Sequence, residues 1–464
     1  MALIKSISGI RGTIGGTQGD GLSPLDIVRF TAAYATFISQ NTPADASGRR
    51  TIVVGRDARL SGPMVDKIVV GTLQAMGMDV VNIGLASTPT TEIAVVGENA
   101  AGGIILTASH NPRQWNALKL LNSDGEFLND EQGKQVLAIA EAGDFVWAEV
   151  NNLGTVSVNE TYNRKHIDMV LGLDLVDVEA IKAANLTVAI DAVNSVGGVI
   201  VPMLLKALGV KNVIELNCEP NGQFAHTPEP IPENLGQISS LMAQGGVDVG
   251  LVVDPDVDRL ALVMENGEMF VEEYTLVSVA DYILSHTPGA TVSNLSSSRA
   301  LRDVTQAHGC TYSAAAVGEV NVTTKMKETG AVIGGEGNGG VIYPAAHYGR
   351  DALVGIGLFL TLLAKSGKKM TQLKATYPAY SISKNKVELT PDINVDAILE
   401  AVKQRYAGEE INDIDGVKID FADSWVHLRR SNTEPIIRIY SEAATAQQAD
   451  ALAETVKQEI LKFV

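Results

Sequence analysis

Cysteine is scarce in this chain, with Cys218 and Cys310 alone among 464 residues. Two cysteines cannot build a disulfide framework, so the sequence predicts a protein of a reducing compartment, the cytoplasm. Basic residues are also few, because 36 lysines and arginines face 54 aspartates and glutamates, which gives a net charge of −18. A chain this acidic is repelled by anionic polymers and surfaces, so we expect no nucleic-acid partner and no membrane partner.

Long apolar runs are missing as well. The longest stretch, residues 352–364, is interrupted by two glycines and Thr361, so it is too short to span a bilayer and predicts a buried helix. The N-terminus lacks the apolar core of a signal peptide. The chain instead has a globular composition, with 45% hydrophobic and 19% charged residues. Its length suggests about three or four domains.

The same order of elements recurs three times along the chain. Apolar strands at 51–54, 187–191 and 291–295 are each followed by a helix that stops at a glycine. A second strand then follows in each case, at 80–83, 213–216 and 310–313. This alternation predicts three similar α/β units with mixed, largely parallel sheets, although any α/β protein shares part of the pattern.

The C-terminal part of the chain follows a different pattern. Two strands, around Trp425 and around Ile437, flank a polar turn, and residues 443–463 have the pattern of an amphipathic helix. This pattern predicts a small α+β domain. We therefore expect four domains, at 1–153, 154–255, 256–370 and 371–464.

A polar loop, TASHNP at residues 107–112, follows the strand at 103–107. Parallel α/β units build their sites at the carboxyl ends of strands, so Ser109 is a candidate nucleophile or phosphate carrier with His110 beside it. A plain Asn-Pro turn is the alternative explanation of the same residues.

Three aspartates, Asp254, Asp256 and Asp258, alternate directly after the apolar strand at 250–253, and Arg259 follows them. Carboxylates so close together repel one another unless a cation neutralises them, and carboxylate oxygens are the ligands of Mg²⁺. An exposed acidic loop is the alternative. The apolar strand directly before the aspartates favours a metal site, with Arg259 as an anion-binding group.

A glycine-rich loop at 334–340 follows an expected strand at 331–333. Its spacing fits a dinucleotide-binding fingerprint poorly. Glu336 and Asn338 offer hydrogen-bond acceptors and donors that suit sugar hydroxyls, and a flexible glycine turn is an equal alternative.

The segment RRSNTEP at 429–435 combines a guanidinium, hydroxyls, an amide and the N–H groups of a turn. Such groups can cradle a phosphate, although a charged hairpin turn is the alternative. The candidate phosphate ligands are Arg429, Ser431, Asn432 and Thr433.

In this order, the motifs resemble those of the α-D-phosphohexomutase family, which comprises phosphoglucomutases, phosphomannomutases and phosphoglucosamine mutases. The resemblance covers nearly the whole chain and includes the N-terminal motif SGIRG at 8–12. It implies three similar α/β domains and a smaller α+β domain around a central cleft, and an isomerase that transfers phosphoryl groups within hexose phosphates. The glycine-rich loop is similar to an archaeal-type branch often assigned as phosphoglucosamine mutases. Glucosamine phosphate is therefore favoured, with mannose or glucose phosphate as alternatives.

The resemblance also implies a role for each motif, with one Mg²⁺ per chain and a hexose 1,6-bisphosphate as the primer that phosphorylates the serine. Lys119 is implied as a general acid and base, and the alternative role of its ammonium group is to form an ion pair with phosphate. The implied residues are Ser109, His110 and Lys119 for catalysis; Asp254, Asp256, Asp258 and Ser109 for the metal; Glu336, Asn338, Arg429, Ser431, Asn432 and Thr433 for the sugar phosphate; and Arg11, Arg56 and Arg259 for the phosphoserine side of the cleft.

The chain departs from the family pattern at Gly340, where many relatives have His, and at Asn338, where many have Ser. His347 or Arg350 could replace the missing histidine. Two functions of other classes stay open: a metal-dependent sugar phosphatase that uses Ser109, and a sugar-phosphate binding protein without activity. The quaternary structure is expected to be a monomer or a homodimer.

Overall fold

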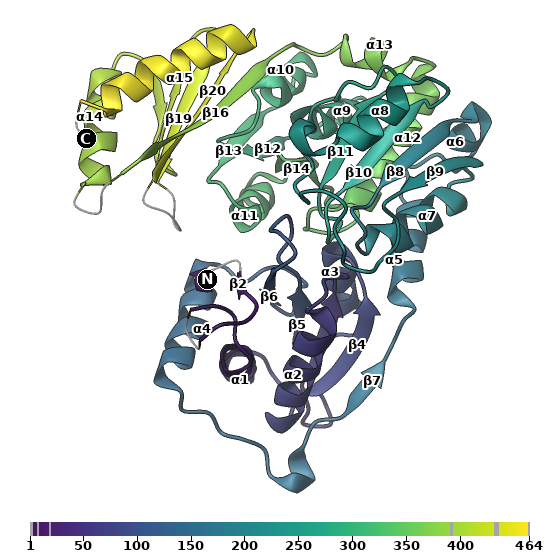
Figure 1. Cartoon of the computed structure of the whole chain (residues 1–464), viewed down its shortest axis with the longest axis vertical. Helices are drawn as coiled ribbons and strands as arrows, with labels where there is room; N and C mark the ends of the chain where they lie inside the picture. The colour runs from purple at the N-terminus through teal and green to yellow at the C-terminus, as the bar shows by residue number, and fades with distance from the viewer. Residues whose placement is uncertain (1–2, 7–8, 18–19, 390–392, 431–435, 463–464) are drawn as a thin grey trace. The chain divides into compact units, whose positions relative to one another are not determined.

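The computed structural model describes residues 3–6, 9–17, 20–389, 393–430 and 436–462 (Figure 1). The chain divides into two compact units. The first comprises Met1–Thr275 and Gly339–Thr371, and the second comprises Leu276–Asn338 and Gln372–Val464. In the part of the chain that is described, no helix is both long and apolar enough to cross a membrane.

The first unit begins with a seven-stranded mixed sheet in the order β1-β2-β6-β5-β3-β4-β7. One face carries a core to which Ile52 and Val54 of β3 contribute, together with side chains of α1, α2 and α4, while α3 packs on the other face. The elements of this part are β1 (Leu3–Ser6), β2 (Gly9–Thr13), α1 (Pro24–Asn41), β3 (Thr51–Arg56), α2 (Gly62–Ala75), β4 (Asp79–Leu85), α3 (Thr88–Gly97), β5 (Gly102–Leu106), β6 (Trp115–Leu121), α4 (Asp130–Ala142), a 3-10 turn (Val150–Asn152) and β7 (Val156–Val158).

A second sheet of the first unit has the order β11-β10-β8-β9. The buried helix predicted at 352–364 is present as α12 and packs against α5 and α6. The elements of this part are α5 (Tyr162–Leu171), α6 (Val178–Ala184), β8 (Thr187–Asp191), α7 (Gly197–Ala207), β9 (Asn212–Leu216), a 3-10 turn (Pro232–Asn234), α8 (Gly236–Ala243), β10 (Val249–Val253), β11 (Leu260–Met264), β15 (Gly340–Ile342) and α12 (Ala352–Ser366). Two helices, α9 (Glu272–Leu284) and α13 (Met370–Lys374), run across the division between the units.

The second unit contains a parallel group of strands and a five-stranded antiparallel sheet in the order β16-β20-β19-β18-β17. One face of the antiparallel sheet packs against α14 and α15 through an apolar core. The elements are β12 (Thr291–Asn294), α10 (Ala300–Ala307), β13 (Tyr312–Ala315), α11 (Glu319–Thr329), β14 (Ile333–Glu336), β16 (Ser381–Glu388), α14 (Val395–Arg405), β17 (Glu410–Asn412), β18 (Val417–Asp420), β19 (Trp425–Arg430), β20 (Ile436–Ala443) and α15 (Ala446–Ile460).

The three predicted α/β repeats share one strand arrangement. In each, the first strand lies between the second and the third and is parallel to both: β3 between β4 and β5, β8 between β9 and β10, and β12 between β13 and β14. The predicted fold class, three α/β domains with largely parallel sheets and a C-terminal α+β domain, is confirmed. The four residue boundaries stay a prediction.

Some element limits differ from those predicted. The strand expected at 331–333 is β14, which continues to Glu336 because a glycine at 334 lets the strand lie against Val292; a Cβ there would be 2.8 Å from the Val292 carbonyl oxygen. The strand expected at 310–313 begins two residues later, at Tyr312. The last helix begins at Ala446, because β20 runs on to Ala443 and the Thr445 side chain caps the helix.

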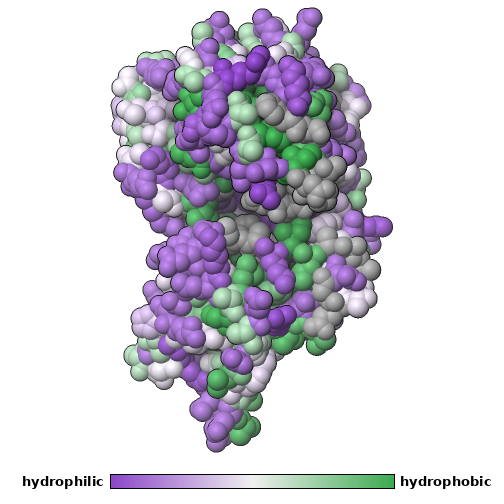
Figure 2. All heavy atoms as spheres, turned by 90° about the vertical axis from the view of Figure 1, so that its left-hand side faces the viewer, coloured by the Kyte–Doolittle hydropathy of each residue, from purple (hydrophilic) through white to green (hydrophobic). Residues whose placement is uncertain are grey.

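Hydrophilic residues cover much of the surface visible in the space-filling view (Figure 2). Hydrophobic residues are visible between them in smaller groups. This surface agrees with the high negative charge of the chain.

Candidate active site

Ser109 lies in the loop after β5, in the first unit. Its hydroxyl donates a hydrogen bond of 3.0 Å to Oδ2 of Asp254. Its backbone adopts φ +49°, in the left-handed region that residues other than glycine rarely enter. The hydroxyl oxygen of Thr107 holds this conformation by accepting the backbone N–H of Ser109 at 3.0 Å. The loop therefore presents the serine hydroxyl in one defined orientation.

Arg59 is fully buried and holds the same loop by hydrogen bonds. Its Nε donates to the Asp57 carboxylate at 2.9 Å, and Asp57 also accepts the hydroxyl of Thr107 at 2.7 Å. The two terminal nitrogens donate to four backbone carbonyls, those of Ser109, Asn111, Pro112 and Trp115. A guanidinium has five N–H donors, so all five are used on this clamp.

The three aspartates of the loop after β10 are all fully buried, and one carboxylate oxygen of each lies within 4.8 Å of the others. Oδ1 of Asp254 accepts the N–H groups of Asp258 and Arg259. Among the described residues, Oδ1 of Asp256 and Oδ1 of Asp258 are buried without any hydrogen-bond partner. Buried carboxylate oxygens without partners are costly unless a cation binds them, so the residues present fit a hard divalent cation.

Electrostatics supports this fit. Burial, together with the charges of Asp258 and Asp256, raises the pKa of Asp254 well above its ordinary value. Burial would also raise the pKa of Asp256, but the ammonium group of Lys119 outweighs it and lowers this pKa below the ordinary range. A cation bound by Oδ1 of Asp256 and Oδ1 of Asp258 would relieve the repulsion that acts on Asp254.

Lys119 lies on β6, whose pairing with β5 places it opposite Ile105, near the strand end that leads to Ser109. Its Nζ is 2.6 Å from Oδ2 of Asp256 and 3.7 Å from Oδ2 of Asp258. Burial lowers the pKa of Lys119, but the two aspartates raise it more, so its pKa lies above the ordinary value. The lysine is therefore charged, which suits a proton donor or a phosphate partner rather than a resting base.

Positive charge gathers around His110. The guanidinium of Arg259, burial and the guanidinium of Arg11 lower the pKa of His110 to about 2. Nδ1 of this neutral imidazole is 3.4 Å from the Ser109 hydroxyl. A site with this local field can stabilise a phosphate dianion within an acidic protein. Arg56, the third predicted arginine, donates to the carbonyl of Asp57 at 3.2 Å, and its role near the serine stays a prediction.

The predicted sugar-binding pair lies in the second unit, at the end of β14. Glu336 is buried, and its Oε1 accepts the amide N–H of Asn294 at 2.8 Å and the backbone N–H of Gly318 at 3.2 Å. The side-chain amide of Asn338 donates to Oε2 of Glu336 at 3.3 Å. The structure thus brings Glu336 and Asn338 together.

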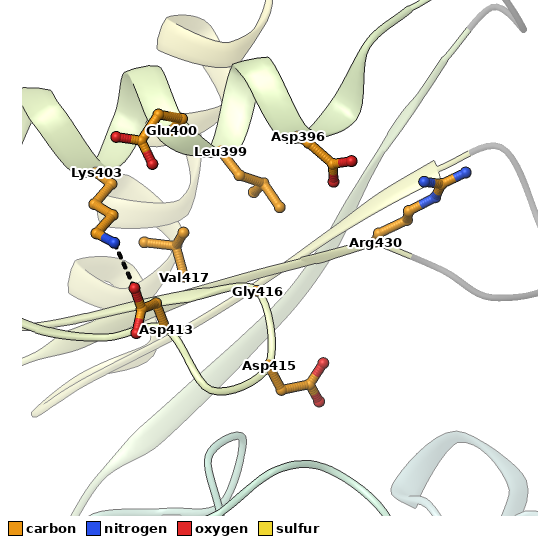
Figure 3. A pocket seen from close by; sticks show the side chains of 9 residues that line it. All are labelled: Asp396, Leu399, Glu400, Lys403, Asp413, Asp415, Gly416, Val417 and Arg430. Carbon is orange, nitrogen blue, oxygen red and sulfur yellow. Dashed lines mark hydrogen bonds and ion pairs between the residues drawn. The ribbon is translucent and has the colours of Figure 1, made fainter. Parts of the chain in front are cut away.

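Arg429, also in the second unit, is fixed on β19. Its Nε contacts Oδ2 of Asp415 at 2.8 Å, and this carboxylate also accepts the backbone N–H of Val317 at 3.0 Å. A cavity of about 300 Å³ next to Asp415 is lined by Asp413 and Arg430 among others (Figure 3). The other predicted phosphate ligands, Ser431, Asn432 and Thr433, lie outside the described residues, as does Ser8 of the N-terminal motif.

Sequence reasoning missed several supporting residues. Arg59 is not among the predicted site residues, and its hydrogen bonds to distant main-chain carbonyls have no local signal in the sequence. The hydroxyl of Thr88, at the start of α3, donates to Oδ2 of Asp256 at 2.6 Å, and its backbone N–H donates to the main-chain carbonyl of Asp256 at 2.9 Å. A Ser-Thr-Pro sequence before a helix marks a helix start, but it does not indicate this contact.

Comparison with known proteins agrees with this geometry. The chain matches all four domain families described as phosphoglucomutase/phosphomannomutase: α/β/α domains I, II and III at residues 3–147, 164–267 and 272–380, and the C-terminal domain at 385–459. The chain belongs to the phosphoglucomutase/phosphomannomutase family. It is therefore a phosphohexomutase, an isomerase.

Relatives of this family cover nearly the whole chain. A phosphoglucomutase/phosphomannomutase of Thermococcus kodakarensis is 35% identical over 94% of this chain and 95% of its own length. A probable phosphoglucosamine mutase of Methanopyrus kandleri is 31% identical over 96% of this chain and 95% of its own length. A crystal structure of a phosphoglucomutase/phosphomannomutase family protein from Burkholderia thailandensis superposes with a TM-score of 0.83 at 25% identity, covering 99% and 98% of the two chains.

Proposed function

We propose that this enzyme interconverts hexose 1-phosphates and 6-phosphates through phosphorylated Ser109 and a hexose 1,6-bisphosphate, with glucosamine phosphate as the preferred substrate. The observation that carries the proposal is the hydrogen bond of 3.0 Å from the Ser109 hydroxyl to Asp254, beside two buried carboxylate oxygens that have no hydrogen-bond partner among the described residues. A phosphoryl group on this serine would meet the cation site directly.

The proposed metal ligands are Asp254, Asp256, Asp258 and an oxygen of phosphorylated Ser109. A bound Mg²⁺ would supply positive charge against the negative charge that develops on the transferred phosphoryl group. Arg11, Arg56 and Arg259 are proposed to hold the same group from the protein side.

The protein's own groups manage the protons. When the bond between phosphorus and the Ser109 oxygen breaks, a bond from phosphorus to the sugar hydroxyl oxygen forms. The serine oxygen gains a proton and the sugar hydroxyl loses one. Lys119 is charged and is proposed to give its proton to the serine oxygen and to take up the proton that the sugar hydroxyl loses. The same exchange runs in the opposite direction when the bisphosphate has turned and the second phosphoryl group returns. His110 is neutral and is proposed to assist.

We propose that residues of the second unit bind the substrate. Glu336 and Asn338 would hold two sugar hydroxyls, and Arg429 with Ser431, Asn432 and Thr433 would hold the phosphate that is not transferred. Relatives named for glucosamine and for glucose or mannose phosphates stand at similar identity. Mannose or glucose phosphate is therefore the second candidate. We also keep the proposals of a cytoplasmic location and of a monomer or homodimer.

Phosphorus NMR tests the function. The protein is mixed with Mg²⁺, a trace of hexose 1,6-bisphosphate and equal amounts of glucosamine, mannose and glucose 1-phosphates. We expect glucosamine 6-phosphate to grow fastest, and Ser109→Ala to abolish this growth while the fold stays intact. Faster growth of another 6-phosphate would overturn the choice of sugar alone. Release of inorganic phosphate without any 6-phosphate would indicate a phosphatase. Tight binding without turnover would indicate a binding protein.

A further inference from the structure

Asp256 and Asp258 use their two carboxylate oxygens in the same way. Oδ2 of Asp256 is engaged by Lys119 and Thr88, both at 2.6 Å, and Oδ1 has no partner among the described residues. Oδ2 of Asp258 is engaged by Arg350 at 2.6 Å, and Oδ1 again has no hydrogen-bond partner among the described residues, although Nε of Arg259 lies 3.9 Å from it. One oxygen of each carboxylate is thus fixed by protein, and the other is left for a cation.

Arg350 is built into this position rather than loosely placed. Its side chain is only 9% exposed at the ion pair with Asp258. The next residue, Asp351, caps α12 by accepting the N–H of Leu353 at 2.8 Å through Oδ1. The N–H of Ala352 then donates to the carbonyl of Val257, inside the metal loop, at 3.2 Å. The arginine and its target are therefore tied together through the backbone as well.

A buried cluster of side chains anchors the other side of the same turn. Oδ2 of Asp351 contacts Nε2 of His166 at 2.7 Å and Nε2 of His347 at 3.0 Å. Nδ1 of His347 lies 3.4 Å from Oε2 of Glu92. A Cβ on Gly349 would be 1.9 Å from this Glu92 oxygen, so any larger residue there would have to displace the Glu92 side chain. These contacts leave the backbone on both sides of Arg350 little freedom.

The geometry also indicates why Asp258 needs the guanidinium of Arg350 in addition to the ammonium group of Lys119. Nζ of Lys119 is already 3.7 Å from the oxygen of Asp258 that Arg350 engages. Without the arginine, one ammonium group would face two carboxylates. Asp258 could then rotate to share Lys119 or place both oxygens toward the cation, and its orientation would no longer be defined.

We propose that Arg350 is a positioning residue of the metal site: it fixes Oδ2 of Asp258 so that Oδ1 faces the divalent cation. The inference deepens the proposed function and rests on its metal site. It requires no particular sugar. Since outer-shell partners of metal ligands commonly change affinity by about ten- to a hundredfold, the effect is measurable by binding alone.

The experiment measures Mn²⁺ binding to the unphosphorylated full-length protein by electron paramagnetic resonance. We expect Arg350→Gln to raise the dissociation constant at least about tenfold, and Arg350→Lys to fall between this variant and the original protein. Arg164→Gln is the matched control, because it removes an exposed arginine that pairs with Asp168 on α5, and it should bind Mn²⁺ unchanged. Thermal unfolding without metal checks that each variant is folded.

Two outcomes would overturn the proposal. A folded Arg350→Gln variant with unchanged Mn²⁺ affinity would show that Asp258 needs no such partner. Unchanged Mn²⁺ affinity with a raised KM for sugar phosphate would make Arg350 a substrate ligand instead. If Arg350→Gln does not fold, Arg350→Lys decides by the same comparison. Failure of the metal site itself is distinguishable, because the original protein and Asp258→Asn would then bind Mn²⁺ equally.

Discussion

The hydroxyl of Ser109 donates to Oδ2 of Asp254 across 145 residues of chain. The two residues follow β5 and β10, the third strands of two successive α/β repeats, so the same position in each repeat supplies one half of the contact. Equivalent strand ends thus provide the proposed phosphate carrier in one repeat and the proposed metal ligands in the next. Each repeat alone offers only a polar loop at a strand end.

Magnesium should stabilise the fold measurably. The three buried aspartates repel one another, and a bound cation relieves this repulsion. We expect Mg²⁺ at about 100 times its dissociation constant to raise the free energy of unfolding by about 2.7 kcal/mol. The thermal midpoint of the first unit should then rise by about 5 °C or more. Differential scanning calorimetry with Mg²⁺ and with a chelator measures this change. Asp256→Asn should largely remove it, whereas Asp168→Asn, at an exposed carboxylate, should not. An equal midpoint with and without Mg²⁺ would contradict the metal site.

Arg59 should be needed for stability and for phosphorylation of Ser109. Arg59→Met removes the cation that pairs with the buried carboxylate of Asp57 and the guanidinium donors of four carbonyls, so we expect the free energy of unfolding to fall by about 3 kcal/mol. Urea unfolding measures the loss, and mass spectrometry measures phosphate on Ser109 after incubation with a hexose 1,6-bisphosphate. Arg113→Met is the control, because that arginine contacts only the exposed Gln223 side chain at 3.3 Å among its described hydrogen bonds. Comparable losses in both variants would argue against the clamp.

His427 should make the second unit sensitive to acid. Its Nε2–H donates to the carbonyl of Asp415 at 2.7 Å, and its Nδ1 lies 2.9 Å from the hydroxyl of Ser296. Burial lowers the pKa of His427 to about 4, against about 6.5 in an unfolded chain. The unfolded state binds the extra proton, so stability is complete above pH 6.5 and falls by about 3 kcal/mol as the pH drops to 4.

Trp425 on the same strand reports this loss by fluorescence when Trp115 and Trp147 are replaced by Phe. Urea unfolding at several pH values should give a steep fall in the original protein between pH 6.5 and 4, and a shallower one in His427→Gln. Parallel curves for the two proteins would mean that another group controls the acid transition.

Asp415 should control how tightly the substrate phosphate is held. Asp415→Asn weakens the ion pair that fixes Arg429, so we expect KM for the sugar phosphate to rise about tenfold while kcat changes less. Steady-state kinetics with Mg²⁺ and primer gives both constants. Asp413→Asn is the matched control, because Asp413 lies on the same loop but pairs with Lys403 at the surface (Figure 3). A loss of kcat with unchanged KM would assign Asp415 to another step.

Sequence predicted the fold well, because the fold depends on local signals, and the same signals indicated polar loops at the strand ends. Hydrophobic strands, helix-ending glycines and polar residues at strand ends are visible in any short window, and they led to Ser109 and to Asp254. Sequence did not reveal Arg59 or Thr88, because each acts on partners far along the chain. It also did not reveal which oxygen of Asp258 is engaged, since that depends on the turn before α12.

The limits of β14 were missed for a related reason. A run of glycines indicates a loop in isolation, yet at 334 the glycine is required inside a strand because Val292 and Met326 approach too closely for a side chain. The extent of a strand is decided by its neighbours, which the sequence pattern of one segment does not contain.

The hydrogen bonds of Arg59 restrict substitution at position 59 much more than at the positions that accept them. Four of its five acceptors are main-chain carbonyls, which every amino acid supplies. The side chains at 111, 112 and 115 can therefore be exchanged in design or by drift without removing an acceptor. Position 59 has no such freedom, because lysine offers three donors from one point and cannot span the turn. A library that randomises the serine loop can thus alter its chemistry while leaving the architecture intact, provided that this one arginine is kept.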